Sequence, residues 1–447
     1  MPGLVLSTAA TTLGMSTRTA MSTTTTIRTI RMLLLQLCFE RMSYGMCDKR
    51  KVFMLRFLIL QQDKKLSKRS SRMNNTISPE KELYFELFEQ YKKRIKTKHL
   101  TLEAFRFERE SAKELAIAAH AIVNHEWNVR GYFPFKVYHP TREINAPMYI
   151  DRIVEQWFVE TYIQPVFKPQ LYEYNMACQS GKGPFLTMDY VKAAMEEMYY
   201  MYGTNWCVYQ YDIKGYFDNF SHAATKSIMQ EIGEEGYQIY EKIVDSFHVS
   251  DCYAARNDSV HSDGYGFPKG NLPSQWTGII LLNELDLEIH DNPDCDFNIR
   301  YMDDGLNFFH TIGQCRDCDA HVREFLEVNE MGIRLHPRKT YYAPISRGFT
   351  FCGWRYSMDL DGTIHVRIKN SKKKEMEHRL KVISEEVRMG KMSIEKANTI
   401  RDGMFEYLSH GTESNKLIKY MKHQYPIPFI KKEKDVGFSK RKREEKI

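Results

Sequence analysis

The stretch that most constrains this chain runs from Asn298 to Phe309 and carries two adjacent aspartates, Asp303 and Asp304, between two apolar runs. The aromatic and β-branched residues of those runs favour strands, so we predict a hairpin with a tight turn. Desolvating two adjacent carboxylates costs on the order of several kcal/mol each unless a cation lies beside them. An ordinary solvated Asp-Asp-Gly turn has the same sequence, so the rest of the chain must decide.

A second acidic position ends another apolar strand. Residues 206–213 have the aromatic and β-branched composition of a buried strand, and Asp212 interrupts it near its end. A lone Asp there is often only a helix cap. Carboxylates that converge from neighbouring strands, however, form a site for two hard cations, and Mg²⁺ keeps coordination positions open for phosphate oxygens. Asp212 together with Asp303 therefore predicts in-line phosphoryl transfer.

Between these sites lies a turn rich in Gly and Pro, residues 264–275, followed by a helical pattern over 276–290. Its glycines allow the backbone to approach a ligand closely. Ser274 and Gln275 place a hydroxyl and an amide near the predicted helix start, where anion contact is favoured.

Three segments resemble motifs A, B and C of reverse transcriptases, in order and at the usual spacing: residues 212–218, 266–275 and 301–304. The flanking sequence is similar as well. Residues 142–152 and the Gly-Lys-Gly turn at 181–183 resemble the fingers of the bacterial enzymes, residues 335–340 resemble motif D, and residues 348–354 resemble the primer grip. The resemblance covers roughly residues 130 to 425.

The resemblance implies an α+β fold, a right-hand polymerase with fingers, an antiparallel-sheet palm and a helical thumb. We expect N-terminal helices and fingers over residues 73–205, the palm over 206–355, the thumb over 356–430 and a basic tail over 431–447. Residues 1–72 are rich in Ser, Thr and Arg and contain few acids, as in a transit peptide, a disordered leader or a mis-assigned upstream start. We favour the last, since Met73 opens sequence of ordinary composition.

The resemblance assigns the chemistry to a few residues. Asp212 and Asp303 would be the principal ligands of two Mg²⁺ ions, with Mn²⁺ as a substitute, and Asp304 would be a weaker ligand. The backbone carbonyl of Ile213 would add another ligand. Lys339 would protonate or neutralise the leaving pyrophosphate, although a solvated lysine at a strand end is the alternative.

Substrate binding would fall to six residues: Arg142, Lys182, Tyr216, Phe217, Ser274 and Gln275. Arg142 and Lys182 would hold the triphosphate, since a guanidinium fork suits phosphate oxygens. Tyr216 is the first candidate for the aromatic gate that excludes a 2′-hydroxyl, Phe217 is the second, and a packing role is the alternative for either.

The resemblance also implies contacts with an RNA–DNA duplex. The primer grip would contribute Gly353 and Trp354, and a basic thumb face would follow the phosphates. That face comprises Arg367, Lys369, Lys372, Lys373, Lys374 and Arg379. The expected partners are an RNA template, a DNA or RNA primer and dNTPs, and a basic accessory protein is a candidate partner.

Motif B favours one subgroup. Ser274 and Gln275, preceded by Gly270-Asn271, are similar to the enzymes of diversity-generating retroelements, which implies mutagenic cDNA synthesis. Gly305 stands where such enzymes usually carry a bulky residue. Three alternatives stay open: a reverse transcriptase of phage defence, a catalytically inactive RNA-binding relative, and an RNA-directed RNA polymerase with a similar palm.

Composition agrees with a nucleic-acid partner. Lys and Arg total 64 against 57 Asp and Glu, and the excess is concentrated at residues 372–374 and 431–446. Nine scattered cysteines predict reduced thiols. No apolar run reaches the roughly 18 residues that span a bilayer. We therefore expect a cytoplasmic protein without a membrane partner.

Overall fold

The structure, a computed structural model, describes residues 78–97, 101–138, 141–247 and 264–427. The chain divides into two units, 1–77 and 78–447, and everything described below belongs to the second. The predicted leader (1–72) and basic tail (431–447) lie outside the described residues. Among the described helices, none is long and apolar enough to cross a membrane.

Two helices, α3 (Pro79–Thr97) and α4 (Leu102–Val123), open the described chain, and α3 begins at a proline, which suits a first helical position. A two-stranded antiparallel sheet follows, made of β1 (Tyr132–Val137) and β2 (Arg142–Pro147). The chain then runs through a series of helical segments: α5 (Tyr149–Phe158), the π-helix η1 (Val159–Ile163), α6 (Gln164–Phe167), the 3₁₀ turn η2 (Lys168–Gln170) and α7 (Pro184–Tyr202).

The central sheet is built on β3 (Cys207–Lys214), the buried strand that the sequence predicts. Its strand order is β4-β5-β3-β6, and β7 also pairs with β3; every pairing is antiparallel. β3 pairs with β5 (Asp304–Phe309), β6 (Arg334–Leu335) and β7 (Tyr341–Pro344), and β4 (Cys295–Tyr301) pairs with β5. The fold is therefore α+β with antiparallel sheets, as predicted.

Between β3 and β4 the chain is helical: η3 (Tyr216–Asp218), α8 (His222–Met229), η4 (Gln230–Ile232), α9 (Glu234–Asp245), α10 (Leu272–Leu281) and α11 (Asn283–Asp291). The single helix predicted over 276–290 is thus two helices, because Leu282 leaves helical geometry with φ −103° and ψ 10°.

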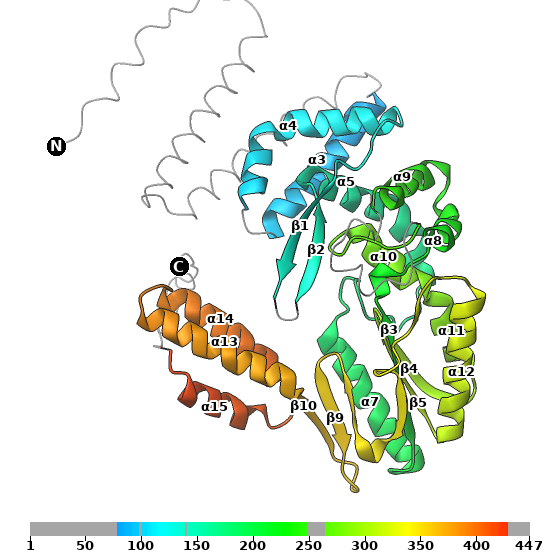
Figure 1. Cartoon of the computed structure of the whole chain (residues 1–447), viewed down its shortest axis with the longest axis vertical. Coiled ribbons are helices and arrows are strands. Elements are labelled where there is room, and N and C mark those ends of the chain that lie inside the picture. The colour runs from blue at the N-terminus through cyan, green and yellow to red at the C-terminus, as the bar shows by residue number, and fades with distance from the viewer. Residues whose placement is uncertain (1–77, 98–100, 139–140, 248–263, 428–447) are drawn as a thin grey trace, which may run out of the picture. The chain divides into compact units, whose positions relative to one another are not determined.

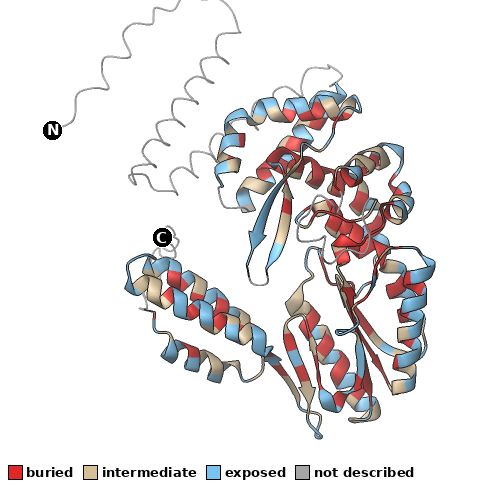
Figure 2. Ribbon diagram, viewed as in Figure 1, coloured by how far each residue is buried: buried red, intermediate tan, exposed pale blue. Residues whose placement is uncertain are grey.

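Alternation along β3 places its side chains in two cores, one on each sheet face. Tyr209 and Tyr211 belong to the core that includes α12 (Ile312–Val328), whereas Val208 packs with residues of α7. Figure 1 shows α11 and α12 on one side of the sheet and α7 on the other. Figure 2 shows these central strands as mostly buried. Asp212 shares the face of Val208, two steps of the alternation further along the strand.

The C-terminal part begins with the short turn η7 (Ile345–Arg347) and a three-stranded antiparallel sheet of β8 (Phe349–Phe351), β9 (Trp354–Met358) and β10 (Ile364–Ile368). Three helices follow: α13 (Asn370–Arg388), α14 (Ile394–Ser409) and α15 (Ser414–Gln424). Figure 1 shows α13, α14 and α15 grouped together beyond this small sheet.

Candidate active site

The turn between β4 and β5 consists of two residues, Met302 and Asp303, flanked by the paired residues Tyr301 and Asp304. Met302 has φ +58°, which is uncommon for a residue with a side chain, and it is the first central residue of a mirror-image hairpin turn. The amide of Ile213 on β3 donates to the carbonyl of Asp303 at 3.1 Å. The two predicted strands and their tight turn are confirmed, and the turn is bonded to the neighbouring strand.

The three aspartates gather at the end of the central sheet. Asp212 on β3 lies directly opposite Asp304 on β5, and Asp303 precedes Asp304 in the turn. Burial raises the pKa of Asp303, and the negative charge of Asp212 adds to that shift. Burial, followed by the charges of Asp303 and Asp212, raises the pKa of Asp304 to about 7. A cation beside Asp303 and Asp304 would favour their charged forms and so counter these two shifts.

Lys339 supplies a cation to this cluster. Its ammonium group donates to both carboxylate oxygens of Asp212, at 2.8 and 3.1 Å, although its side chain is 60 % exposed. The backbone near Lys339 also holds β3, because the amide of His336 donates to the carbonyl of Asp212 at 2.7 Å. The segment predicted to approach the leaving group therefore reaches the acids.

Carboxylate oxygens, such as those of Asp212, Asp303 and Asp304, are the ligands that hard divalent cations prefer. As the side chains stand, the described residues contain no group of three or more His, Cys, Asp or Glu placed to hold a metal ion. Lys339 occupies the carboxylate of Asp212. Binding a metal between the acids would therefore require Asp212 to exchange this ammonium group for the ion.

The two gate candidates differ in burial. Tyr216 is only 5 % exposed, and its hydroxyl donates to the carbonyl of Gly278 in α10 at 2.6 Å. Its ring packs edge-on against Phe220. Because the Tyr216 ring fills the core, it has no face to offer a sugar. The next residue, Phe217, is partly exposed.

The turn before α10 is tied to its surroundings at several points. Asn271 caps α10, its side chain accepting from the amide of Ser274 at 3.0 Å and donating to Glu155 at 2.7 Å. Lys269 forms an ion pair with Asp218 of η3 at 2.7 Å. Ser274 itself is 1 % exposed, so its hydroxyl does not face solvent as the sequence suggested.

Gln275, in contrast, is linked through Cys178 to the turn that carries Asp303. It is partly exposed, and the Sγ of Cys178 lies 3.6 Å from its Oε1 and 3.7 Å from the Sδ of Met302. Gln275 and Met302 thus contact the same side chain. The residue predicted to contact the nucleotide or the template lies beside the Asp303 turn.

The two predicted triphosphate ligands differ in their surroundings. Arg142, at the start of β2, is exposed, and its charge lowers the pKa of Asp303 against the stronger effect of burial. Lys182 donates instead to the backbone carbonyls of Glu173 and Asn175, at 2.6 and 3.0 Å. These bonds tie the ammonium group of Lys182 to its own loop, whereas Arg142 is exposed.

The residues predicted to contact nucleic acid also differ in burial. Trp354 is 1 % exposed and stacks on Tyr407 with ring centroids 5.1 Å apart, so it is a core residue and not a surface contact. Gly353 occupies the turn before it with φ +85°. The predicted basic residues, by contrast, lie at the end of β10 and on the first turns of α13, exposed or partly exposed: Arg367, Lys369, Lys372, Lys373, Lys374 and Arg379.

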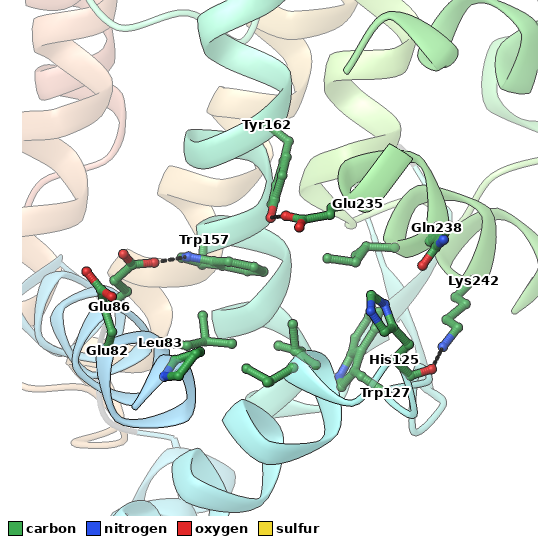
Figure 3. A pocket seen from close by; sticks show the side chains of 14 residues that line it. Glu82, Leu83, Glu86, His125, Trp127, Trp157, Tyr162, Glu235, Gln238 and Lys242 are labelled. Atoms are coloured by element: carbon green, nitrogen blue, oxygen red, sulfur yellow. Dashed lines mark hydrogen bonds between the residues drawn. The ribbon is translucent and has the colours of Figure 1, made fainter. Parts of the chain in front are cut away.

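A cavity of about 290 Å³ opens within this basic surface and is lined by Arg367, Lys373 and Lys416 among others. A second cavity, of about 320 Å³, lies between α3, α5 and α9 (Figure 3). Its lining includes Trp157 and Tyr162 but none of the predicted site residues. Asp212, Asp303 and Asp304 line neither of these two cavities.

Gly305 follows the acids and pairs with Tyr211 across the β3–β5 ladder. A Cβ placed on Gly305 would lie 2.1 Å from Cζ of Tyr211, whose ring is fully buried. The Tyr211 ring therefore occupies the volume that a side chain at 305 would need, and the glycine that departs from the reverse transcriptase pattern is explained by its cross-strand partner.

No protein-family model and no curated protein matches the chain. Among solved structures, apo telomerase from Candida tropicalis is 12 % identical with a TM-score of 0.41, over 66 % of this chain. A form of it truncated from the C-terminal domain is 12 % identical with a TM-score of 0.37, over 57 %. Telomerase from Candida albicans in complex with a TWJ fragment of telomeric RNA is 10 % identical with a TM-score of 0.40, over 71 %.

In each case the match covers 60 % of the telomerase chain, so this chain spans less than two thirds of those proteins. At these identities and scores the likeness is a resemblance alone. The assignment of function rests on the residues of the chain itself.

Proposed function

We propose that this chain is an RNA-directed DNA polymerase that extends a primer by two-metal nucleotidyl transfer. The observation that carries the proposal is the direct pairing of Asp212 with Asp304 across β3 and β5, with Asp303 fixed beside them in a tight turn. This arrangement unites motifs that lie far apart in sequence at one sheet end.

In this proposal Asp212 and Asp303 hold two Mg²⁺ ions, or Mn²⁺ in their place, with Asp304 and the Ile213 carbonyl as supporting ligands. The bound ions would activate the primer hydroxyl and stabilise the leaving pyrophosphate. Lys339, which now pairs with Asp212, would neutralise the leaving pyrophosphate with its ammonium group.

The other substrate contacts are assigned to predicted site residues whose side chains are at least partly exposed. Phe217 is the gate that excludes a 2′-hydroxyl, since Tyr216 is committed to the core. Arg142 binds the triphosphate, and Gln275 contacts the nucleotide or the template near Met302. When the protein is given primed RNA and equal concentrations of dNTPs and NTPs, we expect it to incorporate dNTPs. Preferential incorporation of NTPs would instead indicate an RNA polymerase.

The basic surface at the start of α13 binds the duplex through its phosphates in this proposal. Arg367 and Lys373 lie beside Lys416 around one cavity there. Retention of a labelled RNA–DNA duplex should therefore weaken steeply as salt increases, and a flat salt dependence would remove this surface from the proposal.

We further propose that the polymerase serves a diversity-generating retroelement, is cytoplasmic and works with a basic accessory protein. The support is the sequence of motif B, Ser274-Gln275 after Gly270-Asn271. A near-identical repeat pair that differs at adenines in the flanking DNA would support this subgroup, and a defence operon would replace it.

The decisive experiment is primer extension on RNA by the purified full chain with dNTPs and Mg²⁺. Asp303→Ala should lower kcat by about a thousandfold or more, because a ligand that stabilises transition-state charge is worth several kcal/mol. RNA affinity should stay near that of the wild type, since no phosphate contact is lost. Wild-type chain that binds RNA and extends nothing with Mg²⁺ or Mn²⁺ would overturn the proposal in favour of an inactive RNA-binding relative.

A further inference from the structure

Arg300 lies on β4, three residues before Asp303, and is 1 % exposed. Its guanidinium group donates to both carboxylate oxygens of Asp286 on α11, with N–O distances of 2.7 to 2.9 Å. Burial opposes the charge on Arg300, but the Asp286 carboxylate outweighs it and raises the pKa of Arg300 above its ordinary value. The guanidinium is therefore a charged group buried beneath the hairpin.

The remaining donors of Arg300 point to two backbone carbonyls. One nitrogen, Nη2, donates to the carbonyl of Ile279 in α10, and Nη1 donates to the carbonyl of Met302, each at 2.9 Å. The Met302 carbonyl belongs to the peptide that precedes Asp303. The peptide that follows Asp303 is bonded to the amide of Ile213 on β3. Both peptides that flank the Cα of Asp303 are thus held by hydrogen bonds.

The conformation of the turn requires such support. Met302 has φ +58°, a region that residues with a Cβ populate only when their surroundings hold them there. The hairpin is bonded on the other side through β3, but the peptide between Met302 and Asp303 receives its side-chain donor from Arg300. A change in this peptide would move the Asp303 carboxylate relative to Asp212.

A purely stabilising role explains these contacts less well. A buried ion pair is a weak device for stability, because apolar side chains of similar volume often stabilise a fold as much or more. The fork of Arg300 also joins α10, α11 and the turn, and one of its five bonds ends on the residue before the predicted metal ligand.

We propose that Arg300, held by Asp286, is a positioning residue that sets the location of the Asp303 carboxylate through the Met302 peptide. This inference rests on the proposed polymerase function. It predicts that Arg300 affects the rate of the chemical step more than the binding of either substrate, since neither nucleotide nor duplex touches a buried guanidinium.

The test compares two variants in the full chain by primer extension on RNA. The double variant R300M/D286L removes both buried charges and keeps apolar volume. R300K keeps the positive charge beside Asp286 but replaces the planar fork, which an ammonium group does not reproduce. R401K is the matched control, because Arg401 is also a buried arginine paired to an aspartate, Asp402, but lies on α14 away from the turn.

We expect both Arg300 variants to lose about 100-fold in kcat, the order of loss that a 1 Å misplacement of reacting groups causes. The KM for dNTP and the affinity for the primed RNA should stay near the wild-type values. R401K should keep the wild-type kcat. Thermal melting monitors folding, and if R300M/D286L does not fold, the comparison of R300K with R401K decides.

The outcomes separate this inference from the proposed function. An active wild type together with wild-type kcat in R300K, or in a folded R300M/D286L, would overturn the positioning role and leave the polymerase assignment intact. A wild type that extends no primer would overturn both.

Discussion

Two β-hairpins of this molecule have similar apolar residues but differ in how far those residues are buried. The β4–β5 hairpin lies within the central sheet, and Ile299, Leu306 and Phe308 on its strands are at most 1 % exposed. The β1–β2 hairpin pairs with no other strand among the described residues, and Phe133 and Phe135 are 60 % and 41 % exposed. An apolar alternating strand therefore does not by itself predict burial; the presence of a second layer does.

The difference also separates two residues of the proposed site. Asp303 is held by strand pairing and by Arg300, so its position depends on the core. Arg142 lies on an exposed strand end, and its usefulness depends on charge and reach. Substitutions in the first hairpin should mainly change stability and kcat, and those in the second should mainly change substrate binding.

A large loss of stability is expected from Gly305→Ala in the buried hairpin. The new Cβ would lie within 2.6 Å of three Tyr211 atoms, and the ring has no room to move. The free energy of unfolding, measured with denaturant, should fall by about 3 kcal/mol, the upper range for overpacking. Gly313→Ala in α12 is the control, since its Cβ meets only Thr311 Oγ1 at 3.7 Å. Equal effects at the two glycines would contradict the role of Tyr211.

The free energy of unfolding is expected to depend on pH through Asp151, by at most about 3 kcal/mol. Its carboxylate accepts from the amide of Arg130 just before β1, it is 0 % exposed, and burial raises its pKa to about 6. A raised pKa means that the folded state binds the proton more tightly than the unfolded state. Protonation of Asp151 therefore stabilises the folded state, and this stabilisation is lost as pH rises from about 4 through 6.

Asp151→Asn should therefore be more stable than the wild type at pH 7.5, and the gap should close towards pH 4.5 in denaturant titrations. Asp189→Asn, at an exposed position of α7, should show no such dependence. A gap of the same size at both pH values would show that the Asp151 carboxylate does not titrate in this range.

A smaller effect is expected from Arg142→Ala. The KM for dNTP should rise about tenfold, since charge-assisted hydrogen bonds contribute about 1.5–3 kcal/mol and an exposed one contributes less. The unfolding free energy should stay within about 0.5 kcal/mol. Lys136→Ala is the control, because Lys136 pairs with Glu143 and so lies on the opposite face of the same hairpin. An unchanged KM in Arg142→Ala would remove Arg142 from the triphosphate site.

The smallest effect is expected from Phe135→Ser on β1, with a change in unfolding free energy within about 0.5 kcal/mol, as for most surface substitutions. Phe308→Ser on β5 should cost about 3–5 kcal/mol, because its ring is fully buried. Similar losses of unfolding free energy at both positions would mean that Phe135 is covered in solution. The two hairpins would then not differ in burial.

The sequence predicted most of the elements near the site because their signals are local. The alternating apolar pattern around Asp303, the strand that ends at Asp212 and the proline that opens α3 each depend on a few neighbouring residues. The α+β class with antiparallel sheets was instead implied by the resemblance of the three motifs to reverse transcriptases. The break at Leu282 was missed, since nothing in its immediate sequence interrupts the helical pattern.

The individual site residues were less predictable, because adjacent side chains of one chemical type can face opposite environments. Tyr216 and Phe217 are both aromatic, yet the carbonyl of Gly278, distant in sequence, holds Tyr216 in the core. The fold likewise directs Lys182 to backbone carbonyls and Trp354 to Tyr407.

By itself, the sequence determined that two adjacent aspartates lie between apolar strand-forming runs, where their like charges repel wherever the chain folds. Only the tertiary structure decided which acids meet, with Asp212 opposite Asp304, and which neighbours hold them. Arg300 and Tyr211 act through contacts with Asp286 and Gly305, and such contacts exist only after the sheet and helices have packed. Spacing along a chain fixes local geometry, whereas the position of a buried group depends on every element that surrounds it.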